Sequence, residues 1–190
     1  MEGQRASPRP CTEPIFVGFA GRIGAGKTSA ATYLTHKYGF QYKRYSQVLE
    51  GWASTETPDR DRLQQFGWDV MTGGLQAELN ARLIGGIDSS RSAAIDGLRH
   101  LIDFQCLSSA FGRSFEMIFL EARQEHRFER LKARFSTPAA FDAADSHSVE
   151  AQIDDLRSRA SLAIRNEDSP GRLYQQLDAW LATRRLGDRP

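Results

Sequence analysis

Three glycines, a lysine and a threonine stand within eight residues in the stretch GRIGAGKT, which runs from Gly21 to Thr28. The spacing matches G-x-x-x-x-G-K-[ST], a pattern in which glycines let several backbone N–H groups converge on phosphate oxygens. An apolar run over residues 15–20 precedes the stretch and a helical pattern follows it, so the positive end of a helix would point at the same place. The stretch therefore predicts a phosphate-binding loop, formed by Gly21, Ile23, Gly24, Ala25, Gly26, Lys27, Thr28 and Ser29.

Two side chains at the end of this loop carry the chemistry that a nucleoside triphosphate needs. Lys27 can bridge the β- and γ-phosphates, and the hydroxyl of Thr28 is placed to ligate magnesium. A glycine-rich turn without a ligand is the alternative, but the strand before it and the helix after it give the motif its required context. We therefore expect ATP and Mg²⁺ as cofactors.

A second candidate site lies in AAIDGLR, where Asp96 ends a short apolar stretch and Arg99 follows three residues later. An aspartate at the end of a buried strand can hold magnesium through water or polarise the attacking group, and an arginine can grip a second phosphate with two hydrogen bonds. An ordinary Asp-Gly turn is the alternative interpretation. Beside a phosphate loop we expect both residues to be catalytic, with Asp96 also a metal ligand.

The stretch RQEHRFERLKARF, residues 123–135, has a helical pattern with arginines along one side. The stripe consists of Arg123, Arg127, Arg130 and Arg134. It contains no acid, so ion pairs within the helix do not explain it. Aligned arginines repel one another unless anions lie between them, and phosphoryl transfer supplies such an anion. We expect Arg130 and Arg134 to be catalytic; a solvated basic face, or pairing with Asp142 or Asp145, is the alternative.

Segments with strand character alternate with amphipathic helical segments, as in the β-α-β units of a parallel sheet. Such sheets bind ligands at the carboxyl ends of their strands, where the phosphate loop would lie. The sequence therefore predicts an α/β fold with three layers, α/β/α, a mainly parallel five-stranded sheet and a small helical lid. The expected strands are 15–20, 40–46, 92–96, 115–122 and 162–166. The expected helices are 27–38, 59–71, 75–83, 101–111, 123–135, 146–163 and 170–182.

Length and composition fit one globular domain without a general affinity for polyanions. The chain has 190 residues, a net charge of +1 and 40% apolar residues. We expect a disordered leader over residues 1–13, a single domain over 14–182 and a frayed tail over 183–190. No apolar run approaches the roughly 20 residues that cross a membrane. A cytoplasmic protein is expected, a monomer or homodimer that binds neither membranes nor nucleic acid stably.

Four stretches resemble the P-loop nucleoside monophosphate kinase superfamily. They are GFAGRIGAGKTSAATYL, AIDGLR, FERLKARF and EAQIDDLRSRASLAIRNEDSPGRLYQQLDAWL, and the similarity covers about residues 14–182. The chain looks closest to the dephospho-CoA-kinase-like branch, which includes an uncharacterised group related to CMP and AMP kinases. Of these motifs, only the phosphate loop is highly specific.

The resemblance implies a P-loop NTPase fold in which an ATP site and an acceptor site face each other beneath a lid. Residues that match functional positions of the family are Lys27 and Thr28 at the ATP phosphates and magnesium, Asp96 and Arg99 facing the acceptor, and Arg130 and Arg134 entering a lid over about 130–148. Ser46 would begin an acceptor-binding region over about 46–86. Asn166 would lie near the ATP base.

The resemblance also implies the reaction, which is ATP-dependent phosphoryl transfer to a nucleoside or deoxynucleoside monophosphate. The chain departs from the family's pattern, because EGWAS and WDVMTGG stand where acceptor arginines are common and the lid stretch STPAAFDAADS carries only acids. Two alternatives stay open: a kinase for another small acceptor such as dephospho-CoA, or a catalytically weak ATP-binding regulatory switch. Trp52 and Trp68 could stack on a base or pack in the core.

Overall fold

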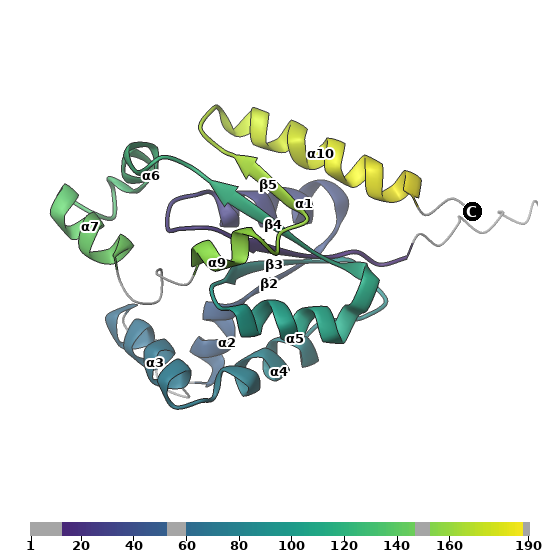
Figure 1. Ribbon diagram of the computed structural model, residues 1–190, viewed down its shortest axis with the longest axis horizontal. Coiled ribbons are helices and arrows are strands. Elements are labelled where there is room, and N and C mark those ends of the chain that lie inside the picture. Colours follow the sequence, from purple (N-terminus) through teal and green to yellow (C-terminus); the bar gives the residue numbers. More distant parts are fainter. Residues whose placement is uncertain (1–12, 53–59, 147–152, 188–190) are drawn as a thin grey trace, which may run out of the picture.

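A five-stranded parallel sheet forms the centre of the molecule and confirms the predicted α/β architecture (Figure 1). The computed structural model describes residues 13–52, 60–146 and 153–187, so the predicted leader lies outside this part except for Glu13. The strands lie in the order β2 (Gln41–Arg44), β3 (Ala93–Leu98), β1 (Phe16–Ala20), β4 (Phe115–Glu121) and β5 (Leu162–Arg165). Each neighbouring pair is parallel, so the five strands end at the same edge of the sheet.

Strand β1 occupies the middle of the sheet because its residues are apolar or glycine and all of them are buried. A Cβ at Gly18 would lie 2.9 Å from Leu98 Cδ2, so the close approach of the side chains around β1 needs a glycine there. Phe19 pairs with Asp96 on β3. This register places the candidate aspartate beside the start of the phosphate loop.

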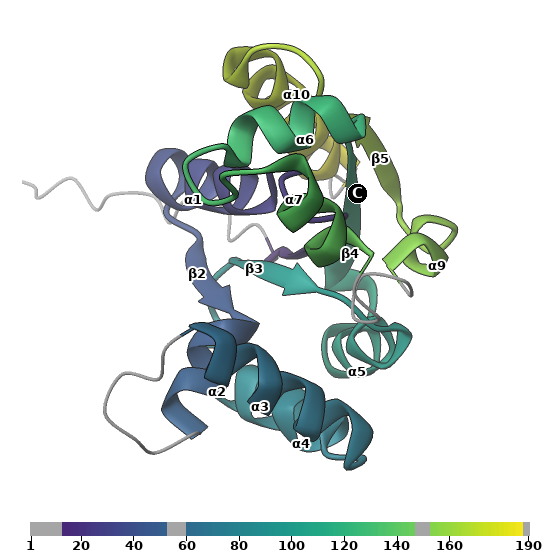
Figure 2. The ribbon, with the colours of Figure 1, turned by 90° about the vertical axis from the view of Figure 1, so that its left-hand side faces the viewer.

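Helices cover both faces of the sheet (Figures 1 and 2). On one face, α1 (Lys27–Tyr38) and α10 (Pro170–Gly187) bury a core that includes Phe19, Leu34, Leu177 and Trp180. On the other, α4 (Gln76–Gly85), α5 (Leu101–Phe111) and α9 (Ile153–Arg157) bury Ile95, Leu107, Met117 and Leu156. The short η1 (Gly112–Ser114) leads from α5 into β4.

Two groups of helices stand at the carboxyl edge of the sheet, on either side of the loop. Helices α2 (Tyr45–Trp52) and α3 (Arg60–Thr72) pack with α4, as Figure 2 shows. Helices α6 (Gln124–Leu131) and α7 (Pro138–Asp145) lie beyond the end of β4, at the left of Figure 1. The phosphate loop therefore has α2, α3 and α4 on one side, within the predicted acceptor-binding region, and α6 and α7 on the other, within the predicted lid.

Several helix boundaries predicted from the sequence are wrong. The helix expected over 123–135 ends at Leu131, and residues 132–134 form a turn. Helix α7 falls within the small helical lid predicted over about 130–148, although its bounds were not predicted. Thr137 caps it by accepting a hydrogen bond from Ala140 N, and Pro138 follows the cap. Both are ordinary start signals for a helix.

The helix expected over 146–163 is correct only for α9, because Ser146 is the C-cap of α7 and α9 stops at Arg157. Residues 147–152 of this expected helix lie outside the described residues. The chain has to turn after α9, since Ser161 N donates to Met117 O as β5 begins to pair with β4. Helix α10 continues to Gly187, five residues past the predicted end at 182. Even so, no helix within the described ranges is long and apolar enough to cross a membrane.

Replacing Leu34 with alanine should test the packing of α1 on the sheet. Its side chain is 0% exposed, so we expect a loss of about 3 kcal/mol in the free energy of unfolding, measured by chemical denaturation. Leu75→Ala is the matched control, because Leu75 is 44% exposed and should change the same free energy by less than about 0.5 kcal/mol. Equal losses in the two variants would contradict the burial of α1.

Candidate active site

The phosphate loop connects β1 to α1, and its neighbours leave no room for side chains on its glycines. Gly21, Gly24 and Gly26 have φ angles of 136°, 78° and 105°, which residues with side chains rarely adopt. A Cβ at Gly26 would lie 2.3 Å from Asn166 Nδ2. Gly26 is also the N-cap of α1, so the N-terminal turn of the helix, with its backbone N–H groups, opens onto the loop. This is the geometry that anion-binding loops have.

Lys27 lies across the mouth of the loop. Its side chain is 9% exposed, and its ammonium Nζ donates to Gly21 O at 2.5 Å and to Arg22 O at 3.1 Å. The two carbonyls hold the positive charge where the terminal phosphates of a triphosphate would arrive. The loop therefore carries both backbone donors and a fixed cation.

Asp96, at the carboxyl half of β3, lies within hydrogen-bonding distance of Thr28. Its Oδ2 accepts hydrogen bonds from Thr28 Oγ1 at 2.7 Å and from Tyr42 Oη at 2.9 Å. Burial and the negative charge of Asp96 raise the pKa of Tyr42 to about 12. Tyr42 therefore stays a hydrogen-bond donor at neutral pH. Tyr42 was not predicted as a site residue, although it lies in the strand expected over residues 40–46.

A magnesium ion carried by ATP fits the donors at this point. Thr28 offers a hydroxyl oxygen and Asp96 a carboxylate oxygen, and hard oxygen ligands of this kind suit Mg²⁺, which keeps several waters and phosphate oxygens in its shell. Asp96 is 3% exposed, so its charge would act on such an ion with little screening by solvent. The two residues predicted as metal ligands therefore lie together.

A cleft of about 880 Å³ runs from the phosphate loop across Asp96 towards α2, α4 and α5. Most of the predicted site residues line it: Ile23, Gly24, Gly26, Lys27, Thr28, Ser29, Asp96, Arg99, Arg130, Arg134 and Asn166. Gly21 and Ala25 do not line the cleft, but their carbonyl oxygens accept hydrogen bonds from Lys27 Nζ and Asn166 Nδ2. The cleft thus brings together predicted site residues that are up to 143 positions apart, from Ile23 to Asn166.

The part of the cleft near β2 and α2 holds polar groups that were not predicted to form a site. Arg44 ends β2, pairs in register with Asp96 and lines the cleft with Arg99. An arginine at the carboxyl end of a strand beside the phosphate loop was the signal that could have revealed it. Ser46 Oγ is buried at the cleft wall and has no hydrogen-bond partner among the residues that the structure describes. Buried polar atoms of this kind usually have a partner, and a ligand can supply one.

Two arginines of the predicted stripe are paired with acids, so its interpretation as an unpaired stripe is wrong. Arg127 is 4% exposed, and its Nη1 and Nη2 donate hydrogen bonds to Asp145 Oδ1 at 2.5 Å and Oδ2 at 2.8 Å. Arg123 Nε lies 3.3 Å from Glu167 Oε1. Because α6 ends at Leu131, the chain turns back and α7 delivers Asp145 to Arg127. Pairing with Asp145 was the alternative interpretation of the stripe.

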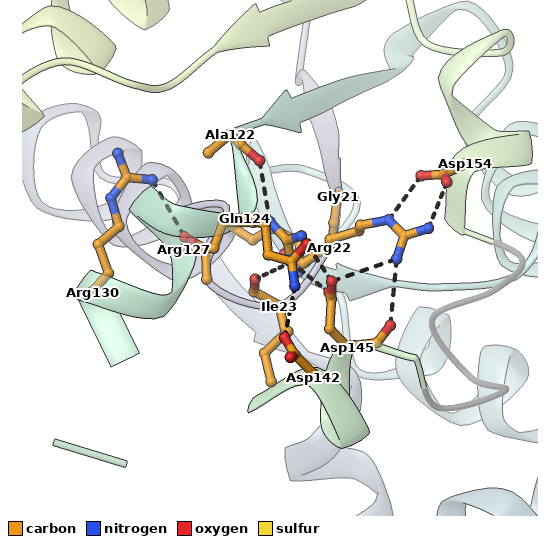
Figure 3. A network of polar contacts seen from close by, with 12 residues as sticks. Gly21, Arg22, Ile23, Ala122, Gln124, Arg127, Arg130, Asp142, Asp145 and Asp154 are labelled. Atoms are coloured by element: carbon orange, nitrogen blue, oxygen red, sulfur yellow. Dashed lines mark hydrogen bonds and ion pairs between the residues drawn. The ribbon is translucent and has the colours of Figure 1, made fainter. Parts of the chain in front are cut away.

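Asp145 also joins the phosphate loop to the lid, as Figure 3 shows. Arg22 Nη1 lies 3.7 Å from Asp145 Oδ2 and donates to Asp145 O, while Arg22 Nη2 donates to Asp154 Oδ2 at 2.7 Å. Gly24 packs directly on α6, because a Cβ there would lie 2.9 Å from Arg127 O. The loop, α6, α7 and α9 are therefore one connected set of contacts.

Arg130 and Asn166 line the cleft beside the phosphate loop. Arg130 Nη2 donates to Asn166 O at 2.6 Å, and Asn166 Nδ2 donates to Ala25 O at 2.8 Å. Partial burial lowers the pKa of Arg130. Arg134 lies in the turn after α6 and also lines the cleft. The side-chain amide of Asn166 thus supports the loop, and its predicted contact with the ATP base stays a prediction.

No family model and no curated protein matches the chain. Solved structures match it over most of its length. They include APS kinase from Mycobacterium tuberculosis, at 15% identity and a TM-score of 0.61, over 90% of this chain and 98% of that one. Shikimate kinase from Acinetobacter baumannii matches at 16% identity and a TM-score of 0.57, over 90% and 94%. A gluconokinase from Sinorhizobium meliloti matches at 15% and 0.58, over 90% and 93%.

The chain has the fold of the P-loop kinases. Identities of 15–16% carry the fold alone. What this P-loop kinase fold does has to be argued from the contents of its cleft. The named neighbours act on chemically different acceptors, so the fold leaves the acceptor open.

Replacing Gly26 with alanine should abolish tight nucleotide binding. The added methyl group would lie 2.3 Å from Asn166 Nδ2 and would need a φ of 105°, so the loop has to move away from its phosphate-binding shape. We expect at least a roughly tenfold weaker affinity for a fluorescent ATP analogue, measured by titration. Gly85→Ala is the matched control, because no atom lies within 4 Å of a Cβ there. An unchanged affinity in the Gly26 variant would contradict this site.

The Tyr42–Asp96 contact predicts a pH dependence of stability. The pKa of Tyr42 is 10.0 in a model peptide and about 12 in the fold, so between these values the unfolded chain has lost a proton that the folded chain keeps. The contribution of Tyr42 to the free energy of unfolding is present below pH 10 and is therefore lost as pH rises towards 12. Measured by chemical denaturation at a series of pH values from 8 upwards, the free energy of unfolding should fall less steeply with pH for Tyr42→Phe than for the wild type. Tyr174→Phe, which leaves Asp96 untouched, should follow the wild type, and the same slope in all three would refute the contact.

Proposed function

We propose that this protein transfers the γ-phosphoryl group of ATP to the phosphate of a nucleoside or deoxynucleoside monophosphate. The observation that carries the proposal is the shared cleft, which joins the phosphate loop to Asp96, Arg44 and Arg99 without a wall between them. A donor phosphate on the loop and an acceptor phosphate at the two arginines would face each other across Asp96. That arrangement suits in-line displacement.

The composition of the acceptor side supports an acceptor that already carries negative charge. Arg44 and Arg99 stand at the ends of neighbouring strands and offer guanidinium groups, which bind phosphate with paired hydrogen bonds. The buried Ser46 Oγ adds a further polar group at the same wall. Arg44 also weakens the case for a regulatory switch, because that alternative rested on missing acceptor arginines.

The residues of the cleft have distinct tasks in this reaction. The backbone of the loop and Lys27 bind the β- and γ-phosphates, and Thr28 with Asp96 would hold magnesium, which neutralises charge on those phosphates. Arg130 and Arg134, which line the cleft, would stabilise the charge on the transferring group. An acceptor phosphate is a competent nucleophile without a strong base, so positioning and charge neutralisation carry the catalysis.

Transfer to a hydroxyl group of another small molecule is the second candidate. Shikimate kinase and a gluconokinase are among the structural neighbours, so this fold also serves acceptors without a nucleobase. In that case Asp96 would have to accept the proton of the hydroxyl. Dephospho-CoA belongs to this second group of acceptors.

Turnover against a panel of acceptors distinguishes these functions. We expect ADP to form from ATP and Mg²⁺ only when a ribo- or deoxynucleoside monophosphate is added, and Lys27→Ala to lower kcat/KM by about 100-fold or more. Lys132→Ala is the matched control, because Lys132 is exposed and pairs with Glu129 outside the cleft. Turnover with dephospho-CoA, shikimate or gluconate alone would replace the acceptor in the proposal. ATP binding without any acceptor-dependent turnover would refute a kinase.

A further inference from the structure

A buried carboxylate lies at the acceptor end of the cleft, away from the transferring phosphate. Asp103, in the first turn of α5, is 1% exposed. It accepts hydrogen bonds from the backbone N atoms of Arg99 and His100, both at 3.0 Å. It also accepts from Gln76 Nε2 at 2.7 Å and Asn80 Nδ2 at 2.9 Å. Four donors surround this carboxylate, whose oxygens act as acceptors in all four hydrogen bonds.

Asn80 completes a closed network with this carboxylate. It is 0% exposed, its Nδ2 also donates to Gln76 O at 2.9 Å, and its Oδ1 accepts from Tyr45 Oη at 2.6 Å. Every polar atom of the Asn80 side chain is therefore used inside the protein. Its task is to fix the first turn of α4 against α5, which holds Gln76 in place.

Gln76 differs from Asn80 because its side chain reaches the cleft. It lines the cleft wall and is 8% exposed. A carboxylate can only accept hydrogen bonds, so the NH₂ group of Gln76 must be the end that faces Asp103. Its carbonyl oxygen Oε1 accepts no hydrogen bond from the part of the chain that the structure describes. Gln76 thus offers an oriented hydrogen-bond acceptor to a ligand.

The surroundings of Gln76 differ in polarity from the region at the strand ends. Leu49 and Leu79 line the cleft from α2 and α4, and Glu50 adds a second carboxylate to that of Asp103. The arginines Arg44 and Arg99 instead follow the ends of β2 and β3. A nucleoside monophosphate with its phosphate at the arginines would place its base beside the leucines. The polar edge of that base would then face side chains rich in hydrogen-bond acceptors.

We infer that Gln76 is a specificity-determining residue that selects acceptor bases with an exocyclic amino group. Its Oε1 accepts a hydrogen bond from that amino group, and Asp103 is the positioning residue that fixes the direction of the amide. Bases of the cytosine and adenine type therefore react in preference to bases with a carbonyl at the same place. The inference rests on the proposed function, since it assumes a nucleoside monophosphate in this half of the cleft.

The network also rejects the wrong base. A carbonyl oxygen at the position of the amino group would face Gln76 Oε1, and neither oxygen has a proton to share. Turning the amide over would bring Oε1 against the Asp103 carboxylate and would remove the hydrogen bond of 2.7 Å. A base with a carbonyl group at this position therefore binds less well whichever way the amide of Gln76 is turned. Other sites also use a glutamine to recognise an amino group on a base.

Matched acceptor pairs test this assignment, because CMP and UMP, and AMP and IMP, differ in an amino group against a carbonyl. We expect the wild type to prefer the amino member by about tenfold or more in kcat/KM. Gln76→Met keeps the length of the side chain, removes its polar atoms and should bring the preference within about threefold of unity. A ratio of two acceptors is independent of the amount of folded enzyme, so loss of stability alone does not change it.

Two further variants sharpen the result. Gln176→Met is the matched control, because Gln176 is on α10 outside the cleft lining, and it should keep the wild-type ratio. Asp103→Asn can present either an oxygen or an NH₂ group to Gln76, so it should lower the ratio while turnover of the carbonyl member persists.

The outcomes separate this inference from the proposed function. No acceptor-dependent turnover with any nucleoside monophosphate would overturn both. Turnover of nucleoside monophosphates without a preference in the wild type, or with a preference that survives Gln76→Met, would overturn the role of Gln76 alone. A ratio that falls in Gln76→Met but is unchanged in Asp103→Asn would overturn the positioning role of Asp103.

Discussion

The hydrogen bond between Thr28 and Asp96 joins the two strands on which the site depends. Thr28 follows the phosphate loop after β1, and Asp96 lies on the neighbouring β3, so a 2.7 Å contact between their side chains fixes the loop relative to the next strand. The contact exists because both strands are parallel and end at one edge of the sheet. With an antiparallel partner, the same aspartate would lie at the opposite end of the loop strand.

The arginines around this contact fall into two groups: some are paired with acids, and others line the cleft. Arginines that lie beside acids serve the architecture, and Arg127, held by Asp145, is the clearest example. Such a buried pair is costly to break from one side, because the remaining charge loses its partner inside the protein. Arg130 and Arg44 line the cleft instead. The number of arginines near a phosphate loop is therefore a poor guide to how many touch phosphate.

The sequence predicted what local patterns encode. The loop motif, the five strands and the position of Asp96 follow from glycine spacing and runs of apolar residues, which are short-range signals. Tyr42 and Arg44 were missed because their importance depends on which strand becomes the neighbour of β3. The Arg127–Asp145 pair was left open for a similar reason, since the turn after Leu131 decides whether α7 returns to α6.

The amide of Gln76 shows the same limit at the level of single atoms. Nothing in the sequence tells which end of a glutamine faces a ligand, because the answer depends on Asp103, 27 positions later in the chain. Ser46 is a milder case, since its position was noted but its buried, unpaired hydroxyl emerged only from packing. Long-range contacts turned residues of ordinary appearance into parts of the cleft.

The shared carboxylate of Asp145 has a thermodynamic consequence. Since Arg22 belongs to the phosphate loop and Arg127 to α6, any rearrangement of the loop on nucleotide binding changes the free energy of the contacts that keep α7 in place. Linkage then works in both directions. If nucleotide binding changes the equilibrium between the docked and undocked positions of α7 by some factor, docking of α7 must change the nucleotide affinity by the same factor. Because Asp145 contacts both Arg22 and Arg127, a substitution that changes the position of α7 also changes the stability of the loop conformation.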